Sequence, residues 1–567
     1  MRKKKYFINS FTALVMSALV FSSCEKFLDV NKNLNSPTAV PVSLILSNAE
    51  IGLANSVALG SGLGGVTSVY THQTIGRVGA DRYGAGAAGW GGLYSSIKDL
   101  DVLIKQGTAE KRFVYVGVAK ILKAYAFSVL VDVYGDCPFS EFNKFEQGIT
   151  QPKFDKGADI YPQLIKLIDE GVADFSNTTP NPSKPGNDDY IYKGNTTNWI
   201  KAANTLKLKL YTQVRLVQDV KTQVAALLAS PTTLINSQAE SFMLPYGPFG
   251  TTDDRHPAYG DYNATQRGGQ LFSPWLYEIM KGRNSNILTG IADPRIPYYI
   301  YNQKSATGST ATPENCTDYR DGGFITITFG STGPCRDGSN SSTYSLLGVY
   351  PAGGRFEDGG AKTINTIGAL NAGTGALPHQ FITYADRLYL EAELINAGVA
   401  SGNEKTVFSK ALDESFLQMD HIITNFVKPG SAGAPQVVPA IAPLAATTTY
   451  KTAVLAAYDK AATASKRLEF IMTEKWINRI ENPVDNWTDY RRTKFPVLFS
   501  PAPIGTVTTF ASPGAPPTYP PTNVPVSNDR AYPLSLPFDV NEISLNSNAL
   551  PQKVAESYRV FWQPVGQ

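Results

Sequence analysis

The chain has 567 residues, far more than one small hydrophobic core requires, and a formal net charge of +3. Four of its 51 Lys and Arg residues lie among the first 23 positions, so the rest of the chain carries 47 basic against 48 acidic residues. Nothing in this balance indicates a nucleic-acid binder, which would need a basic face.

The first 23 residues have the layout of a bacterial-type export signal. Residues 2–5 are basic, residues 6–21 are mainly apolar, and Ser22 and Ser23 precede Cys24. Small residues directly before a cysteine are typical of a lipobox, in which the cysteine is acylated and becomes the new N-terminus. The chain is then tied to a membrane outside the cytoplasm, because several acyl chains make a lasting anchor.

The alternative is ordinary cleavage near Ser22 and Ser23, with Cys24 incidental, and Phe21 stands where a lipobox usually has Leu. We predict a signal peptide over 1–23, lipidation at Cys24, a polar tether over 24–41 and a single domain over 42–567.

Three further cysteines follow, at Cys137, Cys316 and Cys335. An exported protein meets an oxidising compartment, and Cys316 and Cys335 flank one loop rich in Gly, Ser and Thr, so we predict a disulfide between them. Cys137 is predicted to be a buried free thiol. No Cys or His spacing indicates a metal site, and no cofactor is predicted, with structural calcium left open.

Helical spacing of apolar residues alternates with glycine-rich segments in the first part of the chain. Helices are predicted over 42–58, 90–105, 114–129, 159–175 and 199–217. The segments 60–65 and 84–89 match G-x-G-x-x-G, but neither follows a convincing strand, so both are predicted to be loops without a nucleotide.

Between about 230 and 380 the pattern breaks into short aromatic and Gly-, Thr- and Asn-rich pieces, with one helix near 275–281. Helices return in the third part of the chain, over 384–397, 405–426 and 450–480, and the remainder is Pro-rich and irregular. The fold class predicted is mainly α, with a long irregular insert over about 230–380. Small residues at helix crossings (Ala119, Ala126, Ala385 and Ala392) resemble tetratricopeptide packing.

None of the usual catalytic motifs is present, neither H-E-x-x-H, G-x-S-x-G nor a P-loop. Acid pairs such as Asp253 and Asp254 could serve a glycosidase only at the right separation in space. A structural or adhesive protein would show regular repeats or strands, which are absent. We predict that the chain is not an enzyme.

Segments spread over the whole chain carry a family pattern. They lie at 27–31, 35–37, 123–125, 132–141, 154–161, 199–208, 293–295, 384–393, 474–476, 486–493, 495–496, 530–533 and 541–542. Residues 132–141 follow the pattern D-x-Y-G-D-x-P-[YF]-S-E, and residues 487–493 follow W-x-D-Y-R-R-T. In this order the chain resembles the SusD/RagB family of nutrient-binding outer-membrane lipoproteins, in its SusD-like branch. Lys494 departs from the pattern, where that branch commonly has Gly.

The resemblance implies a lipid-anchored protein on the outer membrane, facing the cell exterior. Such proteins capture a glycan or peptide without chemistry and pass it to a partner SusC-type TonB-dependent transporter. A glycan is favoured over a peptide by the family's majority and by the 29 Tyr and 27 Phe residues. The alternatives are a peptide ligand or a surface glycoside hydrolase.

The residues of the strongest motif are predicted to be architectural, joining the last helices to the loop region through aromatic packing and charge-assisted hydrogen bonds. They are Trp476, Trp487, Asp489, Arg491 and Arg492.

Ligand residues are sought among aromatic side chains with polar neighbours, since a ring can stack on a sugar while its neighbours bond hydroxyl groups. The candidates are Tyr70, Gln73, Arg77, Asp81, Arg82, Tyr83, Tyr259, Tyr262, Asn263 and Trp275. For each of them, packing in the core or a loop is the alternative. Replacing Tyr83 and Tyr262 by Ala is expected to leave folding intact and to weaken ligand binding.

Overall fold

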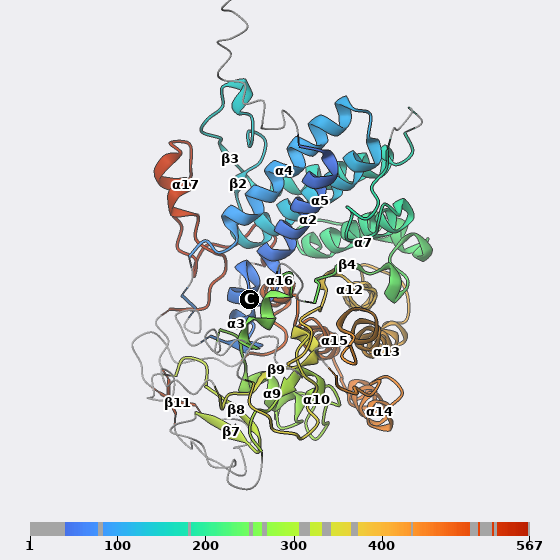
Figure 1. Ribbon diagram of the computed structural model, residues 1–567, viewed down its shortest axis with the longest axis vertical. Helices are drawn as coiled ribbons and strands as arrows, with labels where there is room; N and C mark the ends of the chain where they lie inside the picture. Colours follow the sequence, from blue (N-terminus) through green and yellow to red (C-terminus); the bar gives the residue numbers. More distant parts are fainter. Residues whose placement is uncertain are drawn as a thin grey trace, which may run out of the picture.

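The computed structural model describes most of the chain beyond the first 39 residues. The described ranges are 40–76, 83–84, 86–177, 179, 183–248, 253–262, 269–305, 318–331, 342–364, 372–431, 435–498, 508–510, 524–526 and 530–564. Two groups of packed helices dominate this part of the molecule, with short strands and loops beside them (Figure 1).

The first group comprises the helices of the N-terminal part of the chain. They are α2 (Val42–Val57), α3 (Gly62–Tyr70), α4 (Trp90–Ala109), α5 (Phe113–Tyr134), α6 (Gly157–Asp174), α7 (Thr196–Val214) and α8 (Lys221–Leu228). Consecutive long helices pack on each other, with α4 on α5, α5 on α6 and α6 on α7. This layered pairing confirms the mainly α fold.

Helix α5 is apolar and long enough to cross a membrane, yet it is buried almost throughout by α4, α6 and α7. It approaches α6 closely because two glycines meet where the helices cross. A Cβ atom added to Gly117 would lie 2.5 Å from the carbonyl oxygen of Gly171, too close for any side chain. Gly135 then ends α5 with a φ of 82°, a conformation that glycine adopts without strain.

The second group lies in the C-terminal part. It comprises α12 (Tyr384–Asn396), α13 (Glu404–Ile422), α14 (Ala445–Asp459), α15 (Ala464–Asn478) and α16 (Pro483–Thr493). Thr383 begins α12 with a capping box in which its side chain and that of Asp386 bond each other's backbone N–H groups. Helix α12 packs on α13 and α15, and also on α7, which joins the two groups.

Between the groups the chain forms only short elements in the described residues. The helices are α9 (Pro274–Met280), α10 (Ile296–Tyr299) and α11 (Val349–Ala352). The strands are β4 (Phe242–Leu244), β5 (Leu271–Phe272), β6 (Ile300–Tyr301), β7 (Tyr319–Asp321), β8 (Phe324–Thr326), β9 (Leu346–Leu347) and β10 (His379–Ile382). Strand β4 pairs antiparallel with β10, with Leu244 opposite His379, so the two ends of this irregular region meet at one place.

Five short strands lie outside this region: β1 (Thr74–Ile75), β2 (Cys137–Pro138), β3 (Phe154–Asp155), β11 (Thr508–Phe510) and β12 (Val524–Val526). The short helix α17 (Val540–Leu545) lies near the C-terminus. Strand β1 pairs with β5 and β2 with β3, all antiparallel.

Four sequence-based expectations were wrong in detail. Residues 62–65 of the first glycine-rich segment are helical, the first turn of α3, rather than a loop. The helix expected over 450–480 is two helices, because Thr463 starts α15 by accepting a hydrogen bond from the backbone of Lys466. Helix α8 was missed, and α16 and α17 occupy the region expected to be irregular.

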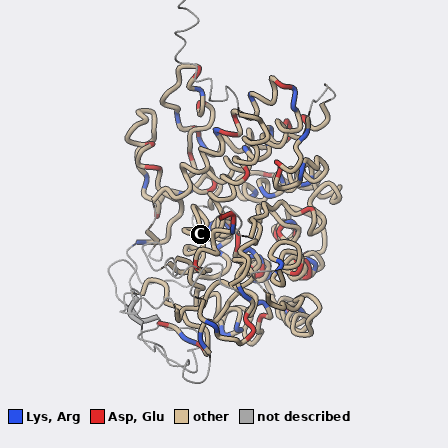
Figure 2. The backbone as a smooth tube through the Cα atoms, in the orientation of Figure 1, with Lys and Arg blue, Asp and Glu red and all other residues tan. Residues whose placement is uncertain are grey.

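Lysine and arginine are interspersed with aspartate and glutamate along the described trace (Figure 2). Cys137 is a buried free thiol, as predicted, and burial raises the pKa of its thiol to about 12. Cys24, Cys316 and Cys335 lie outside the described residues, so the lipid anchor and the disulfide stay predictions.

Candidate ligand-binding site

The first predicted ligand group is buried where the structure describes it. Tyr70, at the end of α3, packs its ring 5.4 Å from that of Trp487, and Gln73 donates to the carbonyl oxygen of Trp476. The Tyr83 hydroxyl bonds Nε2 of the buried His72 at 2.8 Å. These side chains offer almost no surface to a ligand in this conformation. Their predicted partners Arg77, Asp81 and Arg82 lie outside the described residues.

The second predicted group is also largely internal. Tyr259 and Tyr262 stack with ring centres 4.7 Å apart, in a small core of their own. The Tyr262 hydroxyl donates to the carbonyl oxygen of Leu347 and accepts from the backbone N–H of Arg355. Alanine at Tyr262 would therefore disturb packing, contrary to the expectation that folding stays intact. Trp275 of α9 is partly exposed, and Asn263 lies outside the described residues.

The W-x-D-Y-R-R-T segment forms α16, which sits at the centre of the molecule (Figure 1). The Arg491 guanidinium group lies 3.7 Å from the ring centre of Trp487 and donates to the carbonyl oxygens of Asp132 and Leu534. Burial lowers the pKa of Arg491 to about 9. Arg491 thereby links α16 to the end of α5 and to the C-terminal segment.

Arg492, one residue further on, is the centre of a buried charge network. It bonds both carboxylate oxygens of Glu393 on α12, at 2.8 and 2.9 Å, and Asp489 at 2.7 Å. Asp489 in turn pairs with Lys475 of α15 at 2.6 Å, while Trp476 is buried beside it. These contacts give the motif residues structural partners in three helices.

Lys494, the departure from the family pattern, ends α16 with a φ of 64°. Glycine adopts this left-handed conformation without strain, whereas a lysine there costs about 1 kcal/mol. The conformation explains why glycine suits this position.

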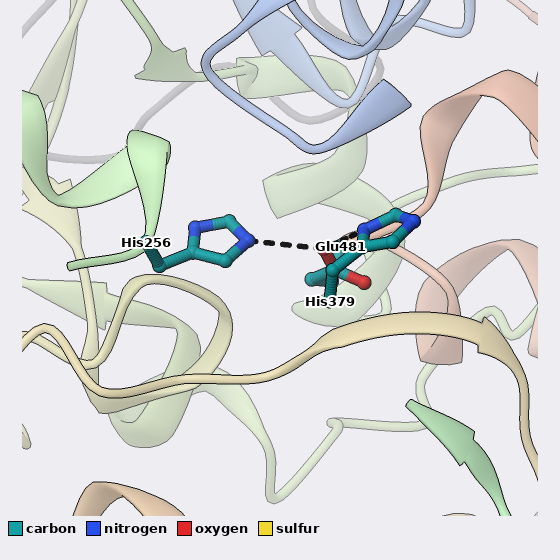
Figure 3. A group of neighbouring side chains, drawn as sticks. All are labelled: His256, His379 and Glu481. Atoms are coloured by element: carbon teal, nitrogen blue, oxygen red, sulfur yellow. Dashed lines mark hydrogen bonds and ion pairs between the residues drawn. The ribbon is translucent and has the colours of Figure 1, made fainter. Parts of the chain in front are cut away.

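Three side chains from distant segments meet in a second buried cluster: His256, His379 of β10, and Glu481 after α15 (Figure 3). Oε1 of Glu481 is hydrogen-bonded to both imidazoles, at 3.0 Å from His256 Nε2 and 2.7 Å from His379 Nδ1. The other oxygen accepts the backbone N–H of Gln380. The cluster fastens two separate parts of the irregular region, one of them its C-terminal end, to the segment that follows α15.

The donor set of two histidines and one carboxylate would suit zinc by residue type. The surrounding hydrogen bonds do not fit a metal, however. His256 Nδ1 accepts the backbone N–H of Ala258, so the proton of a neutral imidazole lies on Nε2, the atom that would have to bind the ion. The proton instead completes the bond to Glu481, and we assign the cluster a structural role.

An open pocket of about 550 Å³ lies between the first turn of α4, the segment that follows β2, and α17. Figure 1 shows these elements together on one side of the molecule. Asn546, just after α17, donates to the carbonyl oxygen of Pro152 and to Glu542, which holds α17 against the opposite wall. The pocket walls are therefore joined by direct hydrogen bonds.

Aromatic rings form one side of this pocket. The ring of Trp90 lies 5.0 Å from that of Tyr94, which lies 4.7 Å from Phe142. Phe145 and Leu545 also line the pocket and are 73% and 77% exposed. Together with the half-buried Phe142 they give the pocket an apolar surface beside its polar groups, and such patches mark binding sites when they are contiguous.

Polar groups line the rest of the pocket. They are Glu141, Asn143, Thr150, Asp539, Asn541, Glu542 and Asn546. Rings beside amide and carboxylate groups are the combination that a sugar needs, since rings cover its apolar faces and the polar groups bond its hydroxyls.

Sequence reasoning did not select these residues. Glu141 and Glu542 belong to family segments, but neither was chosen as a ligand residue. Phe145 offered a signal, because a large aromatic side chain stands alone in the polar run 143–148. The walls come from segments some 400 residues apart, so no local pattern could join them.

The family model described as "Starch-binding associating with outer membrane" matches residues 34–513, most of the chain. The chain belongs to this SusD-like family. SusD-like proteins bind glycans at the cell surface, associate with the outer membrane, and are binding proteins rather than enzymes.

Solved SusD-like structures share the fold at low identity. A SusD homologue from Bacteroides fragilis NCTC 9343 is 18% identical, with a TM-score of 0.62 over 89% of this chain and 94% of its own. A SusD/RagB family protein from Bacteroides thetaiotaomicron VPI-5482 is 17% identical, with a TM-score of 0.63 over 92% and 99%. A chitin-binding protein is 19% identical, with a TM-score of 0.60 over 90% and 95%. No curated protein matches the chain.

Proposed function

We propose that this SusD-like protein captures an oligosaccharide in the pocket between α4, the segment after β2, and α17. The observation that carries the proposal is the exposed ring of Phe145 beside the half-buried Phe142, backed by the buried rings of Trp90 and Tyr94 and surrounded by amides and carboxylates. Supporting it, the family binds glycans, and one protein of the same fold is a chitin-binding protein.

Replacing Phe145 by Ala is expected to weaken glycan binding about tenfold, the loss of 1 to 2 kcal/mol of apolar contact with a sugar face. The ligand would first be found on a glycan array and then titrated calorimetrically. Stability should change by less than about 0.5 kcal/mol, because the ring is 73% exposed. Val437→Ala, at a residue 91% exposed that does not line the pocket, is the matched control. Equal affinity of both variants and the native protein would reject the pocket as the site.

We also propose that Cys24 carries the lipid that holds the protein on the outer membrane, facing the exterior. The Ser22-Ser23-Cys24 end of the leader supports this anchor. A Cys24→Ala variant is expected to fold normally, to stay unlabelled by radioactive palmitate, and to disappear from the cell surface. Surface labelling of intact cells measures the loss, and an unchanged surface signal would contradict the anchor.

The captured ligand, in this proposal, passes to a SusC-type TonB-dependent transporter. Family membership supports such a partner because the family model itself names association with the outer membrane. Affinity purification of the tagged protein from detergent-solubilised outer membranes should recover the transporter in near-equal amount. Recovery of the protein alone under conditions that keep other outer-membrane complexes intact would contradict the partnership.

A further inference from the structure

The charges that line the pocket are of one sign. Glu141, Asp539 and Glu542 are lining residues, and no Lys, Arg or His is among the lining residues that the structure describes. Along the described trace as a whole, basic and acidic residues are interspersed (Figure 2).

In each of these carboxylates, one oxygen accepts the hydrogen bonds that fix the position of the group. Asp539 accepts the backbone N–H groups of Asn541 and Glu542 through Oδ1, and Glu542 accepts from Asn546 through Oε1. Glu141 accepts the backbone N–H of Lys153 through Oε2. These bonds leave Asp539 Oδ2 and Glu542 Oε2 without a hydrogen bond among the described residues, so both oxygens are available to a ligand.

Lys153 and Lys105 pair with acidic side chains other than Asp539 and Glu542. Lys153 is shared between Glu141 at 4.0 Å and Asp155 at 3.8 Å, and Lys105 pairs with Glu146 at 2.6 Å. Lys553 is not among the residues that line the pocket. Its ammonium group donates to the backbone carbonyl of Tyr134 and lies 4.2 Å from the ring centre of Phe538. Neither Asp539 nor Glu542 has an ion-pair partner among the described residues.

We infer that the pocket takes an oligosaccharide that carries protonated amino groups, an amino sugar without its acetyl group at one or more positions; this inference rests on the proposed function. The ammonium groups form charge-assisted hydrogen bonds with the free oxygens of Asp539 and Glu542, and the sugar faces stack on the accessible rings of Phe142 and Phe145. Uronic acids and sulfated sugars are disfavoured because their charges repel the same carboxylates.

The test titrates the full-length chain in detergent with oligosaccharides of equal length built from glucosamine, glucose or galacturonate, at about pH 6, where primary amines are protonated. The glucosamine oligomer is expected to bind about fivefold more tightly than the glucose oligomer at low salt, and galacturonate more weakly than both. The preference should shrink at high salt because partly exposed charges are screened.

The matched variants separate charge from packing. Glu542→Gln keeps the acceptor for Asn546 and is expected to lower the affinity for the glucosamine oligomer about threefold, with little change for the glucose oligomer. Asp459→Asn, on the distant α14, should change neither affinity.

The outcomes are distinguishable. Equal affinity for the glucosamine and glucose oligomers, with Phe145→Ala weakening both, would overturn this inference and leave the proposed function standing. Tightest binding by galacturonate, or tighter binding by a lysine oligopeptide of the same charge, would overturn the ligand class. Failure of every sugar to bind, on the array and in titration, would overturn both the inference and the proposed function.

Discussion

Replacing Arg492 by Met should lower the free energy of unfolding by about 3 to 5 kcal/mol. The guanidinium group is fully buried, with Glu393 and Asp489 as partners at 2.8 and 2.7 Å. Removing it leaves a buried carboxylate of Glu393 with Arg215 as its remaining ion-pair partner among the described residues. Urea unfolding followed by circular dichroism measures the loss as a lower midpoint at unchanged slope.

The matched control is Lys405→Met, since Lys405 pairs with Asp459 at a similar distance of 2.8 Å but with side chains 47% and 51% exposed. It should cost less than about 0.5 kcal/mol. A double variant, Arg492→Met with Glu393→Gln, should cost at least 1 kcal/mol less than the sum of the two single changes, because the partners are in contact. Equal losses for Arg492→Met and Lys405→Met would show that the motif arginine has no special structural role.

Glu481→Gln should lower the free energy of unfolding by about 2 to 4 kcal/mol. The carboxylate accepts three hydrogen bonds, from His256, His379 and the backbone of Gln380. A glutamine has one acceptor oxygen, and its NH₂ group would face another donor. Urea unfolding at neutral pH measures the loss, with Glu146→Gln, at a side chain 81% exposed, as the control expected within about 0.5 kcal/mol.

The same variant has a pH signature. Burial by itself would raise the pKa of Glu481, but the electrostatic attraction of His379 and the hydrogen bonds from His256 and His379 outweigh it and lower the pKa to about 2. A folded-state pKa below the unfolded value of 4.5 contributes stability that is present above pH 4.5 and lost as the pH falls toward 2. The difference in free energy of unfolding between the native protein and the Glu481→Gln variant should therefore shrink as the pH falls over that range. A difference that stays constant down to pH 3 would contradict the charged role of Glu481.

Local pattern predicted the long helices well, because amphipathic spacing and end signals act within a few residues. Helices α4 and α5 begin within a residue of where apolar spacing placed them, and Gly135 ends α5 as expected. Helix α16 was missed for a physical reason. Nine of its residues are buried, among them Asp485, Asp489, Arg491 and Arg492, and a pattern that treats charged residues as exposed finds no buried face there.

Aromatic residues were harder to place. Tyr83 and Tyr262 were chosen as ligand contacts, yet both rings are buried, while Phe145 is exposed in the pocket. The same ring serves a core or a sugar equally well, and only the neighbours that cover it decide between the two.

Most of the long helices, the near-neutral charge and the motifs that place the chain in the SusD-like family could be read from the sequence alone. The packing of the fold was needed to show which charged residues are buried in pairs, which rings face water, and that α17 lines an open pocket together with α4. The reason is that the contacting residues lie far apart along the chain. Arg492 bonds Glu393, Glu481 bonds His256, and Asn546 bonds Pro152. No local pattern in the sequence can join such partners.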